Sequence, residues 1–65
     1  MAKYILNKHQ IKRLIDGKHV IDGHGRKLIA GENVKGVLQK IDENNLYDKF
    51  KVVIENGELD ILKNE

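Results

Sequence analysis

The chain has 65 residues, of which 40% are hydrophobic and 34% charged, the composition of a globular domain and not of a disordered segment. It contains no Cys, so disulfides, thiolate chemistry and cysteine-ligated metal centres are excluded. Ser and Thr are also missing, which leaves the two tyrosines as the only hydroxyl nucleophiles. We therefore expect one domain, residues 1–65, that is not an enzyme and holds no cofactor.

The net charge of +2 is unevenly distributed along the chain. Residues 1–31 carry a net charge of +5 and residues 32–65 a net charge of −3, and all three histidines lie in the basic half. Such asymmetry can attract an anionic partner or draw copies together head to tail, unless the halves intermix in space and the dipole is small. Domains this small usually gain stability from disulfides, metals or partner subunits, so we expect a homo-oligomer.

The N-terminal region predicts a short strand followed by a helix. Residues 2–6 are expected to form the strand, and residues 8–16 the helix. Asn7 is a suitable N-cap, and Gln10 stands at the third helical position, which makes a variant of the capping box. Gly17 supplies the left-handed residue that ends a helix. The apolar stripe of this helix consists of Ile11, Leu14 and Ile15.

Residues 18–30 predict a β-hairpin with strands over 19–22 and 26–30 around the loop Gly23-His24-Gly25. This register places opposite charges and apolar groups across from each other. The predicted pairs are Asp22 with Arg26 and Val20 with Leu28. The other face is half apolar, which indicates burial on both faces or a partner on one of them; it carries His19, Ile21, Lys27 and Ile29.

A second amphipathic helix is expected from Glu32 to about Asn44. Its apolar positions follow helical spacing: Val34, Val37, Leu38 and Ile41. Gly36 lies inside this helix at a cost of about 1 kcal/mol relative to Ala, which suggests the close approach of another backbone. Asn44-Asn45 is a suitable left-handed stop.

The C-terminal region predicts a second hairpin. Residues 50–55 alternate apolar and mixed positions, and Asn56-Gly57 is the preferred pair for a two-residue type I′ turn. The expected register pairs Ile54 with Leu59 and Val52 with Ile61. The predicted fold is therefore α+β, a small single domain in the order β-α-β-β-α-β-β with two β-hairpins and two short helices. Its exposed strand edges suit β-augmentation by a partner or by another copy.

The segment Leu14-Ile15-Asp16-Gly17-Lys18-His19-Val20, a helix that closes on Gly-Lys and passes into a strand, resembles the start of small phage-encoded accessory proteins of the anti-defence type. The resemblance covers residues 10–21. Some of those proteins block bacterial immune systems, and some oligomerise and sequester cyclic-nucleotide signals. The Trp-rich continuation of one such family is missing here, and no functional residue carries over. The resemblance implies a small, self-contained binder and not an enzyme.

Candidate chemistry centres on the first hairpin and the first helix. His19, Asp22 and His24 are of metal-ligating types, but the strand sends His19 and Asp22 to opposite faces, so we expect surface side chains and no metal site. The segment Gly23–Lys27 can gather backbone N–H groups beside two cations and hold an anion, or it can simply be a hairpin turn that needs its glycines. The first helix adds a basic ridge, which can be an anion site or a solvated helix face, at Lys8, His9, Lys12 and Arg13.

The function that we favour from the sequence is non-catalytic binding, as an inhibitor or adaptor of a larger protein. The alternative is an anion binder for nucleic acid or a small nucleotide, and a third interpretation is a structural subunit that associates only with itself. Only three aromatic residues are present, so no stacking platform for bases is evident. With no apolar run of membrane-spanning or signal-peptide length, we expect a cytoplasmic protein that makes no membrane contact. The predicted contact surface consists of Lys8, Lys12, Arg13, His24, Arg26 and Lys27.

Overall fold

A computed structural model describes residues 3–64, which form two helices and five strands. The elements are β1 (Tyr4–Ile5), α1 (Lys8–Ile15), β2 (Val20–Ile21), β3 (Lys27–Leu28), α2 (Glu32–Glu43), β4 (Phe50–Glu55) and β5 (Glu58–Lys63). Their order is the predicted one, and the α+β class is confirmed.

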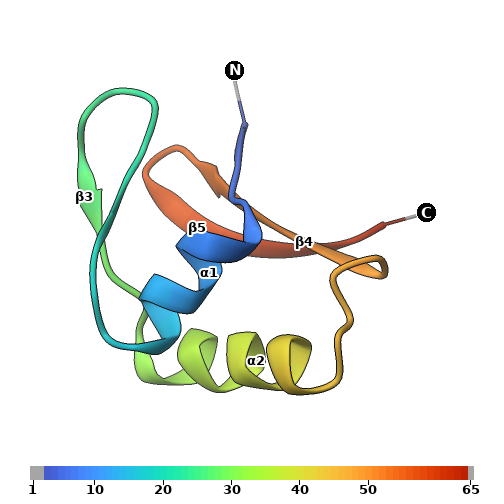
Figure 1. The fold of residues 1–65 in the computed structure, drawn as a ribbon. Helices are drawn as coiled ribbons and strands as arrows, with labels where there is room; N and C mark the ends of the chain where they lie inside the picture. The colour runs from blue at the N-terminus through green and yellow to red at the C-terminus, as the bar shows by residue number, and fades with distance from the viewer. Residues whose placement is uncertain (1–2, 65) are drawn as a thin grey trace.

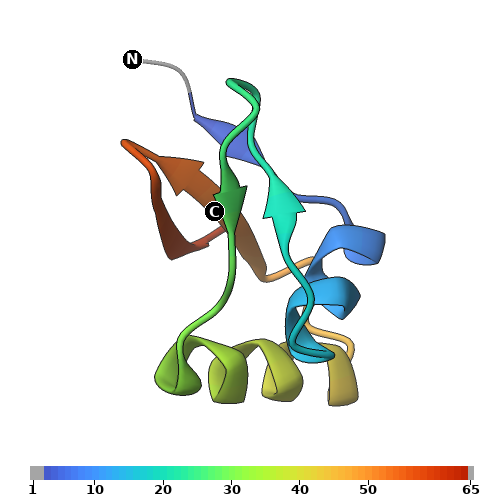
Figure 2. The ribbon, with the colours of Figure 1, turned by 90° about the vertical axis from the view of Figure 1, so that its left-hand side faces the viewer.

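The strands form two antiparallel sheets, one of three strands in the order β1-β4-β5 and one of the two strands β2 and β3. Figure 1 shows α1 in front of the three-stranded sheet and α2 crossing beneath it. Figure 2 shows the β2–β3 hairpin standing above α2, with α1 and the three-stranded sheet on either side of it. The two helices and the hairpin therefore pack against one face of that sheet.

The start and the end of α1 follow the sequence signals. The Asn7 side chain accepts a hydrogen bond from the Gln10 backbone N–H at 2.9 Å. The Gln10 side chain in turn accepts one from the Asn7 N–H at 2.9 Å, which completes the capping box. The helix ends at Ile15, one residue earlier than predicted, with Asp16 as the C-cap and Gly17 at φ +82°.

The first hairpin has the predicted register but shorter strands. Val20 pairs with Leu28, and the Asp22 N–H donates to the Arg26 carbonyl at 2.9 Å. The strands expected over 19–22 and 26–30 are only two residues long each. At one end of the paired residues the chain is held by the hydrogen bonds of the turn, and at the other end it leads into α2. The outer face of this hairpin is uncovered, and Ile29 on that side is 68% exposed.

Two expectations for α2 are wrong. Val37 was expected in the buried stripe, but it is 44% exposed, because only Leu38 and Ile41 of this helix turn fully towards the core. No other backbone approaches Gly36: a Cβ built there would meet nothing within 4 Å outside the helix itself. The predicted left-handed stop lies at Asn45, which has φ +52°.

The second hairpin is confirmed in register and turn. Ile54 pairs with Leu59 and Val52 with Ile61. Asn56 and Gly57 both have positive φ, at +54° and +79°, as a type I′ turn requires. The first strand is shorter than expected, since only Tyr4–Ile5 pairs with β4, and Ala2 lies outside the described residues.

The core lies between the three-stranded sheet and the elements that cover it. Leu14 of α1 and Leu38 of α2 are fully buried against the sheet face that carries Val52 and Ile54. The partly buried Leu28 and Ala30 bring the hairpin side into the same cluster. The turns of both hairpins thus stand at the margin of this core.

Candidate functional site

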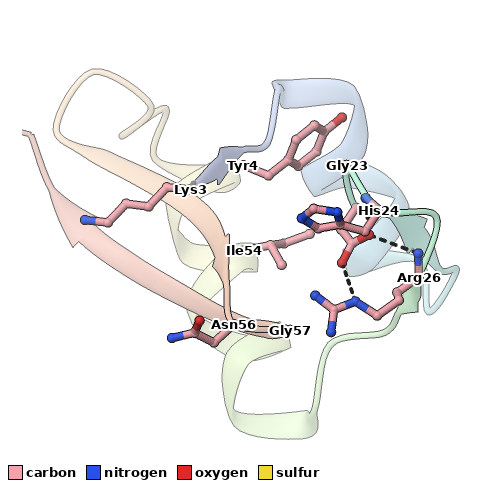
Figure 3. A pocket seen from close by; sticks show the side chains of 9 residues that line it. Lys3, Tyr4, Gly23, His24, Arg26, Ile54, Asn56 and Gly57 are labelled. Carbon is pink, nitrogen blue, oxygen red and sulfur yellow. Dashed lines mark hydrogen bonds and ion pairs between the residues drawn. The ribbon is translucent and has the colours of Figure 1, made fainter. Parts of the chain in front are cut away.

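A cleft of about 350 Å³ lies between the turns of the two hairpins, and we call it the turn cleft. The turn of β2 and β3 contributes Asp22, His24 and Arg26, the second hairpin contributes Ile54 and Gly57, and β1 contributes Tyr4. Figure 3 shows the side chains of Tyr4, His24, Arg26 and Ile54 around the opening. The hairpin turns are 30 residues apart in sequence, so only the tertiary packing makes this site.

Asp22 organises one wall of the turn cleft. Its side chain is only 2% exposed, and one carboxylate oxygen, Oδ1, accepts the backbone N–H groups of His24 at 2.8 Å and Arg26 at 2.9 Å. The other oxygen, Oδ2, accepts the Arg26 Nε–H at 3.0 Å. The backbone N–H of Arg26, more than any other contact, lowers the pKa of Asp22 below its ordinary 3.8; the His24 N–H and the guanidinium act in the same direction, and burial opposes them. Asp22 is therefore an ionised anchor with its oxygens already engaged.

Arg26 is held at one end and free at the other. Its Nε–H is bound to Asp22, while the side chain as a whole remains 57% exposed. The terminal nitrogens lie over Gly57, where a built Cβ would be 3.1 Å from Nη1. Among the described residues neither Nη1 nor Nη2 makes a hydrogen bond. The result is a guanidinium whose orientation is fixed and whose outer N–H groups are available to an oxyanion.

The remaining walls of the cleft differ in character. Figure 3 shows the His24 imidazole directed into the opening, on the side of Ile54, whereas the Lys3 side chain extends away from it. Tyr4 is held by a hydrogen bond between its hydroxyl and the Gln10 side-chain Nε2 at 3.0 Å, and Gly23 packs against its ring. The cleft thus presents one fixed guanidinium and one imidazole beside apolar surface.

The structure brings two of the six predicted basic residues, His24 and Arg26, together in the turn cleft. Lys8 lies over the Tyr47 ring, with Nζ 5.1 Å from the ring centroid, and Arg13 donates its Nε–H to the His19 carbonyl at 3.2 Å. The two remaining predicted residues lie elsewhere: Lys12 is exposed on α1, and Lys27 is on the outer face of the first hairpin, opposite Ile21.

The apolar part of the cleft was not expected from the sequence. Tyr4 and Ile54 are neighbours because β1 pairs with β4 at this position. The Asn56-Gly57 turn was predicted, but its contact with Arg26 depends on how the two hairpins pack. The one signal available in the sequence was the expected pairing of Asp22 with Arg26, which orients the guanidinium.

Within residues 3–64 no group of three or more side chains gathers that could hold a metal ion. Asp22 accepts the backbone N–H of His24, and in the described structure no hydrogen bond joins its carboxylate to the imidazole. What the cleft can do is bind: a cation and a polar ring can hold an oxyanion beside an apolar wall.

Known proteins provide no relative with which this site can be compared. No family model, no curated protein and no solved structure matches the chain. Among the described helices, neither has the length and apolar character needed to cross a bilayer.

Proposed function

We propose that this protein is a non-catalytic binding domain that recognises an anionic group of its partner in the turn cleft. The observation that carries the proposal is the Asp22–Arg26 pair. Asp22 fixes the guanidinium by its Nε–H and leaves the two terminal nitrogens without a partner in the described structure. A prepositioned guanidinium binds a carboxylate or phosphate well, because little side-chain freedom remains to be lost on binding.

Two features support binding in preference to catalysis. The chain has no Ser, Thr or Cys, and the carboxylate in the cleft is already engaged by three hydrogen bonds. A small, self-contained binder is also the class implied by the resemblance of residues 10–21 to phage accessory proteins.

The proposal is tested by isothermal titration with inorganic phosphate and with acetate. We expect one of these anions to bind the wild-type protein and to lose at least about tenfold in affinity in Arg26→Gln, since hydrogen bonds to charged groups are involved. Lys27→Gln is the matched control, because Lys27 is the next residue and carries the same positive charge but lies on the opposite face of the hairpin. Equal binding by Arg26→Gln and wild type would contradict the proposal.

The second candidate function is that of an inhibitor or adaptor of a larger protein, working as a homo-oligomer. It is favoured by the uncovered outer face of the first hairpin, where Ile21 is 49% and Ile29 68% exposed. A domain this small commonly covers such a face with another subunit. Light scattering after gel filtration tests the homo-oligomer: wild type should be larger than a monomer, and Ile29→Lys should be monomeric and folded. A monomeric wild type would refute it.

A further inference from the structure

We propose that the turn cleft binds a single oxyanion attached to an apolar or aromatic body, and not a run of phosphates along a nucleic-acid strand. This inference rests on the proposed function and adds the chemical class of the ligand. It is carried by three features of the structure: the scatter of the other cations, the fixed guanidinium and the apolar side of the cleft.

The positions of the basic residues suit the binding of one anionic group. Among residues 3–64, three basic residues line the turn cleft: Arg26 and His24 are directed into it, whereas the Lys3 side chain extends away from it. Lys8 lies on the ring of Tyr47, and the Nε–H of Arg13 is used by the His19 carbonyl. A protein that follows a single strand needs a basic groove along several successive phosphates, together with aromatic rings on which bases stack. Arg26 and His24 alone do not make such a groove in the turn cleft.

The guanidinium geometry suits one trigonal or tetrahedral oxyanion. Asp22 takes the Nε–H of Arg26, so Nη1 and Nη2 remain to donate outward. Two oxygens of a carboxylate or a phosphate can accept from these two nitrogens in parallel. The His24 imidazole, directed into the same opening, can donate a further hydrogen bond to that group. In the described part of the chain, the one other basic residue that lines the cleft is Lys3, and its side chain extends away from the opening.

The rest of the cleft suits an apolar body. Tyr4 and Ile54 line it on the side of β1 and β4, and the Tyr4 ring is kept in place by the bond between its hydroxyl and Gln10. A volume of about 350 Å³ is larger than a bare inorganic anion needs and lies within the range of small-molecule sites. The ligand class is therefore an aryl or alkyl phosphate or carboxylate, whether a free small molecule or the end of a peptide.

The test compares four probes by isothermal titration and by amide chemical shifts: phenyl phosphate, phenylacetate, inorganic phosphate and a short oligothymidylate. We expect at least one phenyl-bearing probe to bind at least about tenfold more tightly than inorganic phosphate. Its affinity should fall with salt with a log–log slope of about −1 or shallower, since one anionic group is neutralised. The stronger of phenyl phosphate and phenylacetate identifies the source as a phosphate ester or as a carboxylate such as a peptide end.

Four variants show which parts of the cleft are responsible for binding. Arg26→Lys keeps the charge but loses the paired nitrogens, and we expect at least about tenfold weaker binding of the phenyl-bearing probe. Tyr4→Ala should remove the preference for the phenyl probes over inorganic phosphate, and Tyr4→Phe, which retains the ring, should keep it. Lys27→Gln should bind like wild type. Each variant is first compared with wild type by circular dichroism to establish that it is folded.

The outcomes separate this inference from the proposed function. Tighter binding of oligothymidylate, with a salt slope of several units, would overturn the single-anion class while leaving anion binding intact. Equal affinity for inorganic phosphate and the phenyl probes would overturn the claim that the cleft binds the apolar body of its ligand. If none of the four probes binds, or if Arg26→Gln binds them all like wild type, both the inference and the proposed function fail.

Discussion

The clearest stability prediction concerns Gly36, a glycine inside α2 that no tertiary contact explains. Gly36→Ala should stabilise the protein, because glycine in a helix interior costs about 1 kcal/mol relative to alanine. The added Cβ would meet nothing within 4 Å outside the helix, so no clash offsets the gain. For a domain of this size about 1 kcal/mol corresponds to a rise in Tm of roughly 4–8 °C.

The measurement is thermal unfolding followed by circular dichroism, with chemical denaturation for the free energy. Gly17→Ala is the control, because Gly17 has φ +82° and alanine there should cost about 1–2 kcal/mol in backbone strain. The reasoning would be refuted if Gly36→Ala lowered the Tm. That result would mean that another backbone packs on α2, as in a tightly associated oligomer.

Three further predictions concern the core and two titrating groups. Leu38→Ala should cost about 2–5 kcal/mol of unfolding free energy, because Leu38 is fully buried. Val37→Ala, on the exposed side of α2, should lower the unfolding free energy far less, and equal losses for the two variants in denaturant titrations would contradict the placement of α2. Asp22 has a pKa lowered below 3.8 in the folded protein, so its contribution to stability is fully present above 3.8 and is lost as the pH falls from 3.8 through the lowered pKa. Thermal unfolding of Asp22→Asn should therefore depend less on acid pH than that of wild type, and an unchanged dependence would contradict this role. Burial, the larger cause, and the hydrogen bond to Asp42, the second, raise the pKa of Tyr47 from 10.0 to about 12. The protonated phenol therefore stabilises the fold below pH 10.0, and this contribution is lost as the pH rises from 10.0 to about 12. In a titration followed by tyrosinate absorbance, the late step of wild type should be missing in Tyr47→Phe.

Local signals in the sequence predicted the secondary structure well, because each depends on neighbouring residues. Asn7 and Gln10 form the capping box by backbone bonds three residues apart. Asn56-Gly57 sets the second hairpin by its positive φ angles, which in turn fixes the register that buries Val52 and Ile54. These features need no knowledge of the rest of the fold.

The candidate site was predictable only in part, because it is made by packing between distant segments. The pairing of Asp22 with Arg26 is local to one hairpin and was expected from the register of that hairpin. The contact of Arg26 with Gly57, and the presence of Tyr4 beside Ile54, depend on the way the hairpins meet. Helical spacing also predicted Val37 to be in the core, but Val37 is exposed. The spacing of apolar residues does not show which of them the neighbouring elements will cover.

The central claim, that the turn cleft is where an anion binds, is tested most directly by mapping amide chemical shifts during titration with phenyl phosphate. We expect the changes to concentrate at residues 22–26 and 54–57 and at the Arg26 side-chain Nε–H. They should be absent in Arg26→Gln. Changes centred on α1, around Lys8 and Lys12, or spread evenly over the basic half of the chain, would contradict the account.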